Sequence, residues 1–172
     1  MANHKQLVPF ILKWEGGFVN DPDDAGGATY KGVTYETYKA YCRKKGYPVP
    51  TVSMLAKMPQ AHWEEIFKTM YWDRWRADEI KSQSIANILV DWVWASGAWG
   101  IRKPQELVGV LPVGIVGAKT LAAVNSKNPQ ELFEQIKAMR VQFIDDICRR
   151  RPANKKFKRG WLNRINDLKY EG

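Results

Sequence analysis

The chain has 172 residues, a formal net charge of +9, 45% hydrophobic residues and 26% charged residues. This length is enough for one domain with a sizeable core, and the composition excludes an intrinsically disordered chain. No apolar run reaches the length of a transmembrane helix, and two cysteines at positions 42 and 148 provide no disulfide framework or zinc site.

The positive charge is unevenly distributed. Residues 140–172 contain ten basic and four acidic side chains, whereas residues 1–36 contain three basic and five acidic ones. A basic segment of this kind attracts polyanions such as nucleic acid, anionic membranes or bacterial wall polymers, and a solvated surface without a partner is the alternative. The segment lacks the alternating aromatic residues of a base-stacking groove, so we expect no nucleic-acid partner.

The first predicted elements lie within residues 7–46. Apolar residues at helical spacing from Leu7 to Trp14 predict a helix that ends at two glycines, Gly16 and Gly17. The strand signals in residues 18–34 are weak and predict at most a small β-hairpin or an irregular loop. Thr34 is then expected to cap a second helix, which stops at Gly46.

The rest of the chain also shows helical periodicity, so the predicted fold class is mainly α. Residues 84–96 are apolar on nearly all sides, which is typical of a central buried helix. The other predicted segments are a helix opened by Pro59, a glycine-rich loop leading into a short helix near residue 120, a long helix opened by Asn128 and Pro129, a basic loop over residues 149–159, and a last helix containing Trp161, Ile165 and Leu168.

Glu15 is an unusual residue for the end of a helix. The negative end of the helix dipole and the neighbouring Trp14 both favour its protonated form, so it can act as a general acid. The following segment offers three aspartates, Asp21, Asp23 and Asp24, as a second, ionised carboxylate, and Thr29 as a hydroxyl. A protonated and an ionised carboxylate are what cleavage of a glycosidic bond requires. The alternative is that the aspartates form a solvated turn.

Other chemistries have weaker support. A calcium loop with its glycine at Gly26 would place Gly32 where a bidentate glutamate is needed. His4 and His62 are the only histidines, and Cys42 with His62 is a weak case for a thiol hydrolase. We therefore expect no metal site and no cofactor.

The stretch "WEGGFVNDPDDAGGATYKGVT" at residues 14–34 resembles the signature of the glycoside hydrolase family 108 N-acetylmuramidases, phage-type endolysins of the lysozyme superfamily. Further resemblance lies in "YWDRWRAD" and "VDWVWASG", and "GIVGAKTL" and "FKRGWLNRI" are similar to the family's predicted peptidoglycan-binding region. The resemblance implies one lysozyme-like helical domain over residues 1–172, with a catalytic half at 1–97 and a helical, wall-binding half at 98–172.

The resemblance also implies an activity and a set of site residues. The activity is hydrolysis of the β-1,4 bond between N-acetylmuramic acid and N-acetylglucosamine in peptidoglycan, with Glu15 as the catalytic glutamate. Asp24 is the preferred partner, because its interval of nine residues from Glu15 resembles that in phage lysozymes, and Asp21 stays a candidate. Thr29 is expected to assist catalysis. Substrate contacts are expected at Asp21, Gly26, Gly27, Tyr30 and Trp94.

The expected partners are peptidoglycan glycan strands and, through the basic C-terminal segment, anionic wall polymers. The N-terminal apolar run is too short for a secretion signal, so we expect a protein that is made in the cytoplasm and reaches the wall through a holin-type pore or another export route. We also expect the protein to be a monomer. Two alternatives stay open on the sequence. One is a non-catalytic module that binds cell wall or another polyanion, and the other is a peptidoglycan amidase that depends on Zn²⁺ or a thiol.

Overall fold

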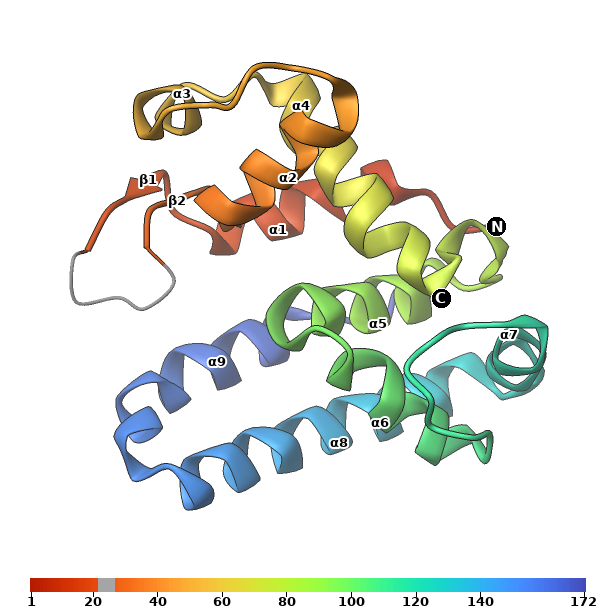
Figure 1. Cartoon of the computed structure of the whole chain (residues 1–172). Coiled ribbons are helices and arrows are strands. Elements are labelled where there is room, and N and C mark those ends of the chain that lie inside the picture. The colour runs from red at the N-terminus through yellow and green to blue at the C-terminus, as the bar shows by residue number, and fades with distance from the viewer. Residues whose placement is uncertain (22–26) are drawn as a thin grey trace. The chain divides into compact units, whose positions relative to one another are not determined.

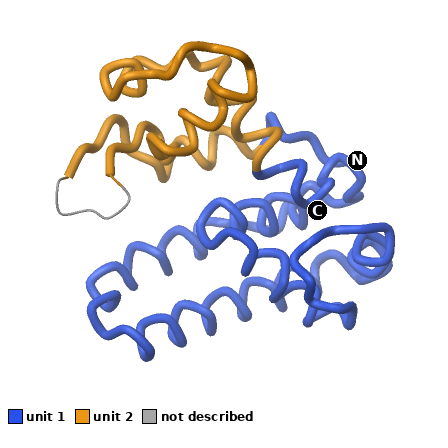
Figure 2. The backbone as a smooth tube through the Cα atoms, in the orientation of Figure 1, with its two compact units in different colours: residues 1–6, 71–172 blue, residues 7–70 orange. Residues whose placement is uncertain are grey.

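The computed structural model describes residues 1–21 and 27–172 (Figure 1). Two compact units are present: Leu7–Met70 forms one, and Met1–Gln6 with Tyr71–Gly172 forms the other (Figure 2). The expected division between residues 97 and 98 stays a prediction. Within the described ranges, no helix has the length and apolar character needed to cross a membrane.

The described residues of the unit Leu7–Met70 form four α-helices and a small sheet. The helices are α1 (Val8–Trp14), α2 (Tyr35–Lys45), α3 (Val52–Ala56) and α4 (Gln60–Phe67). Thr34 caps α2 by accepting a hydrogen bond from the backbone N–H of Thr37 at 3.1 Å, and Gly46 ends it with a φ of 76°, as predicted. The five-residue helix α3 was not predicted, because it is too short to show a periodic pattern.

The sheet is antiparallel, in the order β1 (Phe18–Val19), β2 (Thr29–Tyr30) and β3 (Val33–Thr34). Lys31 and Gly32 join β2 to β3, with φ angles of 48° and 84°. The two-residue turn whose twist matches that of the flanking strands, type I′, needs a positive φ at both central residues. Gly32 adopts such a φ without strain. The small β element near the N-terminus is confirmed, and its tight turn lies inside the "TYKGVT" stretch.

The second unit is helical. A π-helical turn at Lys68–Trp72 leads into it from the first unit, and two 3₁₀ turns follow at Asp73–Trp75 and Ala77–Glu79. Its helices are α5 (Gln83–Ser96), α6 (Trp99–Val108), α7 (Ala118–Ser126), α8 (Pro129–Arg150) and α9 (Lys155–Asp167), with a 3₁₀ turn at Pro152–Asn154 before α9. Figure 1 shows α8 and α9 as long helices joined by this short turn. Asn128 caps α8 by accepting from the N–H of Glu131 at 3.0 Å. The mainly α fold class is confirmed.

Helix α5 is the buried centre of this unit, as predicted, and α6 packs closely against it. A Cβ on Gly100 would lie 2.5 Å from the backbone nitrogen of Val93, so only glycine permits this approach. The sequence did not reveal α6, because Pro104 lies inside it. Pro104 cannot donate to the carbonyl of Gly100, and the indole Nε1 of Trp75 donates to that carbonyl instead, at 3.1 Å.

The prediction of a basic loop over residues 149–159 is wrong. Helix α8 continues to Arg150 and α9 begins at Lys155, so only a four-residue connection separates them. Phe157 and Trp161 lie one helical turn apart in α9, with ring centroids 5.6 Å from each other. The basic side chains of this segment therefore project from two helices and not from a loop.

Candidate active site

Glu15 caps the C-terminal end of α1, at the position predicted from the sequence. Its backbone N–H donates to the carbonyl of Ile11 at 3.0 Å, while its own φ of −94° and ψ of 140° are extended. The chain thus leaves the helix at Glu15 and continues through Gly16 and Gly17 into β1. The Glu15 side chain is half-buried. The backbone of Glu15 is therefore fixed between a helix and a sheet.

The hairpin turn is tied to the segment that follows Glu15. The backbone N–H of Lys31 donates to the carbonyl of Gly17 at 3.2 Å, and the Lys31 carbonyl accepts from the indole Nε1 of Trp63 at 3.0 Å. Trp63 is fully buried in α4, so it anchors the turn to the core of this unit. Glu15, two residues before Gly17, is thereby placed beside the β2–β3 hairpin.

The strand register separates Thr29 from Tyr30. Thr29 pairs with Val19, and Tyr30 pairs with Phe18 on one side and with Val33 on the other. Directly paired residues share one face of a sheet, and successive residues alternate between faces. Tyr30 therefore shares one face with Phe18, which is 42% exposed, and with Val33, which is 1% exposed, whereas Thr29 shares the other face with Val19, which is 49% exposed. Thr29 and Tyr30 are both half-buried, and each face of the sheet carries one exposed side chain of β1.

The other predicted site residues are placed as follows. Asp21 is exposed, and Gly27 has a φ of 71°, a conformation that favours glycine. Asp24 and Gly26 lie outside the described residues. Trp94 belongs to the other unit, where its ring centroid is 4.6 Å from that of Tyr71. The unit Leu7–Met70 thus brings together Glu15, the hairpin with Thr29 and Tyr30, and both ends of the intervening loop.

The residues considered for thiol chemistry have structural roles in the same unit. Cys42 is buried, and burial raises the pKa of its thiol, so a nucleophilic thiolate is disfavoured. His62 Nδ1 lies 3.0 Å from the Tyr38 hydroxyl, and the His62 ring stacks on Tyr47 at 5.5 Å. Among residues 1–21 and 27–172, no group of three or more potential ligands is arranged to hold a metal ion.

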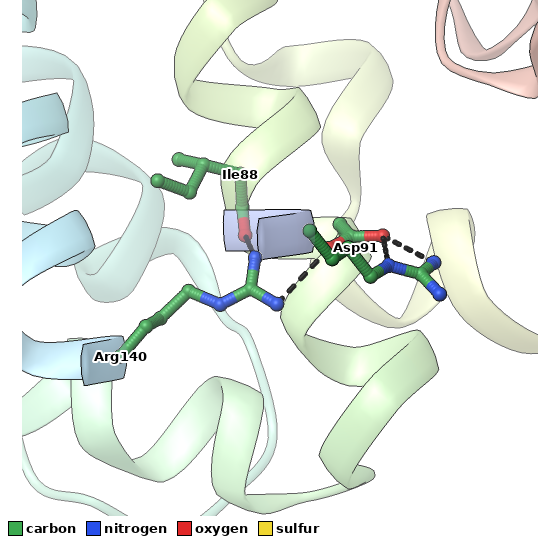
Figure 3. A network of polar contacts seen from close by, with 4 residues as sticks. Ile88, Asp91 and Arg140 are labelled. Atoms are coloured by element: carbon green, nitrogen blue, oxygen red, sulfur yellow. Dashed lines mark hydrogen bonds and ion pairs between the residues drawn. The ribbon is translucent and has the colours of Figure 1, made fainter. Parts of the chain in front are cut away.

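One polar cluster escaped the sequence analysis. Asp91 in α5 has no exposed surface, and its carboxylate accepts hydrogen bonds from two arginines (Figure 3). Arg140 of α8 donates from Nη2 to Oδ2 at 3.0 Å, and Arg164 of α9 donates from Nη2 and Nε to Oδ1 at 2.7 and 3.2 Å. Arg140 also donates from Nη1 to the carbonyl of Ile88 at 3.2 Å. The cluster joins three helices of the second unit.

The energetics of this cluster rest on burial. Burial lowers the pKa of the Arg140 guanidinium, and the carboxylate of Asp91 opposes that change. A charge in an otherwise apolar helix is costly unless it is paired, so Asp91 within the run "ILVDWVW" was itself a signal of a buried partner. Periodicity alone could not identify which basic residues provide it.

Comparison with known proteins identifies the family of the chain. The model of the family "Glycosyl hydrolase 108" matches residues 8–97, more than half of the chain, and the "Predicted Peptidoglycan domain" model matches residues 99–166. The structure of SagA from Brucella abortus is similar at a TM-score of 0.81 and 25% identity, over 95% of this chain and 90% of that one. No curated protein sequence matches. The family match includes Glu15 and the hairpin beside it, and the chain belongs to glycosyl hydrolase family 108 as a glycoside hydrolase that acts on peptidoglycan.

Proposed function

We propose that the enzyme cleaves the β-1,4 bond between N-acetylmuramic acid and N-acetylglucosamine, with Glu15 as the proton donor. The observation that supports this assignment is the position of Glu15 at the end of α1, two residues before the hydrogen bond between Gly17 and the hairpin turn. This arrangement lies within the region that matches the hydrolase family. The enzyme's target in the cell is accordingly the bacterial wall.

The reaction adds one water molecule across the bond. Glu15 donates its proton to the glycosidic oxygen as the bond from that oxygen to C1 of the muramic acid breaks, and the bonding electrons stay on the oxygen. The N-acetylglucosamine product thereby gains a free hydroxyl. Water adds to C1, which creates a new reducing end on N-acetylmuramic acid. A second carboxylate accepts the proton that this water loses, or it stabilises the positive charge at C1 while the ionised Glu15 accepts that proton.

For the second carboxylate we propose Asp24, with Asp21 as the competing candidate. Both precede β2, and the pairing of Val19 with Thr29 closes the loop that carries them. The Thr29 hydroxyl is suited to hold the attacking water, because a hydroxyl both donates and accepts hydrogen bonds.

The central experiment measures new reducing ends released from purified peptidoglycan by the Glu15→Gln variant. Loss of a general acid should lower the rate by about 10²–10⁴-fold. Glu36→Gln is the matched control, because Glu36 is an exposed glutamate in the same unit whose ion pair with Lys39 spans a single helical turn. A Glu15→Gln variant as active as Glu36→Gln would contradict the assignment.

Mass analysis of the released fragments identifies the bond that is cleaved. Muramidase activity leaves N-acetylmuramic acid at the reducing end, whereas a glucosaminidase leaves N-acetylglucosamine there and an amidase releases peptides. The comparison of Asp24→Asn with Asp21→Asn then identifies the partner carboxylate, which should show the larger loss. NMR of the first-formed anomer distinguishes inversion from retention.

Two further experiments test the competing chemistry and the proposed wall contact. Chelation of divalent metals and the Cys42→Ser variant should both leave lysis unchanged, since an amidase of either type would lose activity. We also propose that the basic side chains of α8 and α9 attract anionic wall polymers, because Lys155, Lys156 and Arg159 are all exposed. Binding to intact walls should therefore weaken as salt concentration rises.

A further inference from the structure

The second unit contains a cavity of about 490 Å³ between α5, α8 and α9, within the range of roughly 300–1,000 Å³ typical of pockets that enclose small ligands. Its walls come from residues 92–165, so its lining residues all belong to this unit and do not include Glu15. The hydrolytic mechanism proposed above makes no use of it.

The charges around the cavity have one sign. Four arginines line it, at positions 140, 150, 151 and 164, and no acidic residue occurs among its described lining residues. Asp91 bonds to both Arg140 and Arg164, so this buried group of two positive charges and one negative charge has a net charge of +1. Arg151 is exposed, and its guanidinium makes no hydrogen bond or ion pair within residues 1–21 and 27–172. The cavity is therefore suited to a negatively charged group.

The cavity also has aromatic and aliphatic walls. The ring of Phe143 lies 5.7 Å from that of Trp92 and 6.2 Å from that of Trp99, which makes a continuous aromatic surface. Ile144 and Ile147 add aliphatic surface, and both are only half-buried although they belong to the apolar stripe of α8. A ligand that fills this space must have apolar groups as well as negative charge.

The hydrogen-bonding groups of the cavity are mainly donors. Trp92 is 2% exposed, and its indole N–H has no acceptor in the part of the chain that the structure describes. An indole N–H can only donate, so this group is available to an acceptor atom of a ligand. Trp99 and Trp161 line the same cavity and likewise have indole N–H groups without an acceptor in the described ranges.

We propose that this cavity binds the acidic stem peptide of peptidoglycan, through its carboxylates and its small apolar side chains. The glycan backbone is neutral and rich in hydroxyl donors, which the arginines do not match. Phosphate-bearing wall polymers provide the charge but lack the apolar groups that the tryptophans and isoleucines would cover. A short peptide of alanyl and acidic residues provides both. The choice of peptidoglycan as the polymer rests on the proposed function, whereas binding of its peptide does not require Glu15 to be the catalytic acid.

The test is calorimetric titration of the full chain, carrying Glu15→Gln, with a soluble stem tetrapeptide that has free carboxylates. We expect saturable binding that weakens as salt concentration rises, and no binding of the same peptide with its carboxylates amidated. Arg151→Ala should lower the affinity about tenfold or more, because it removes a charge-assisted hydrogen bond. Trp161→Leu should also weaken binding, which provides a second variant that keeps an apolar side chain.

Arg74→Ala is the matched control, because Arg74 is exposed in the same unit and does not line the cavity. It should bind the peptide with unchanged affinity, and circular dichroism should show all variants folded. Absence of peptide binding would overturn the proposal, as would binding that Arg74→Ala and Arg151→Ala weaken equally. Arg151-dependent binding of peptide-free glycan or of a polyglycerol phosphate, with none of the peptide, would also overturn it. Peptide binding alongside full hydrolytic activity of Glu15→Gln would contradict the proposed function alone.

Discussion

Replacing Asp91 with asparagine should strongly destabilise the enzyme, although the two side chains have nearly the same shape. The Asp91 side chain is 0% exposed, and those of Arg140 and Arg164 are 4% and 13% exposed. The substitution removes the only negative charge that this cluster contains and leaves two buried guanidiniums facing each other. Removing one partner of a buried ion pair costs about 3–5 kcal/mol, much of it from the charge left uncompensated.

The geometry supports this magnitude. The carboxylate accepts three charge-assisted hydrogen bonds at 2.7, 3.0 and 3.2 Å, each of them worth about 1.5–3 kcal/mol. Asparagine keeps one acceptor oxygen and replaces the other with a donor, so part of the network survives. The estimate of about 3–5 kcal/mol corresponds to a fall in melting temperature of about 6–20 °C for a chain of this size.

The assay is urea unfolding at neutral pH, followed by tryptophan fluorescence and circular dichroism. Asp145→Asn is the control, because Asp145 pairs with Lys158 at 2.8 Å on the surface, where both side chains are more than one-third exposed. This control should lose less than about 1 kcal/mol. Equal losses for Asp91→Asn and Asp145→Asn would refute the reasoning. Replacing Asp91, Arg140 and Arg164 together with apolar residues should recover stability, since no buried charge then remains unpaired.

Two further predictions concern packing and pH. Gly100→Ala should destabilise the enzyme by about 1–3 kcal/mol, because the added Cβ would lie 2.5 Å from the backbone nitrogen of Val93. Gly160→Ala is the control in parallel thermal melts. Its added Cβ would meet no atom within 4 Å, so this variant should have unchanged or higher stability. Hydrogen bonds from Lys45 and Tyr41 lower the pKa of Glu65, so Glu65 contributes stability above the pKa of an unfolded glutamate and loses it as pH falls through the lowered pKa. Glu65→Gln should therefore unfold at lower urea than the parent protein at neutral pH and at the same urea in acid, and a gap that persists in acid would contradict this account.

Most elements of the fold were predictable because their signals are local. Thr34, Gly46 and Asn128 mark helix ends through hydrogen bonds or φ angles that depend on a few neighbouring residues. The missed elements lacked such signals. Helix α6 contains a proline, and it persists because Trp75, which is distant in sequence, satisfies the carbonyl that this proline leaves without a donor. The connection between α8 and α9 was expected to be long because its charges obscured the helical spacing of the aromatic residues.

The functional features of the chain likewise include some that local sequence predicts and others that depend on tertiary packing. The sequence by itself determined that Glu15 ends a helix and that a small β element follows, since the apolar period and the two glycines are local features. The turn at Lys31 and Gly32 was not predicted and became evident only in the structure. Only the tertiary structure decided that Asp91 pairs with arginines 49 and 73 residues away and that a cavity lined by arginine and tryptophan opens beside them. Such pairing depends on how helices distant in the chain pack against one another. Because the charges are then buried, removing one of them leaves the other uncompensated and destabilises the fold.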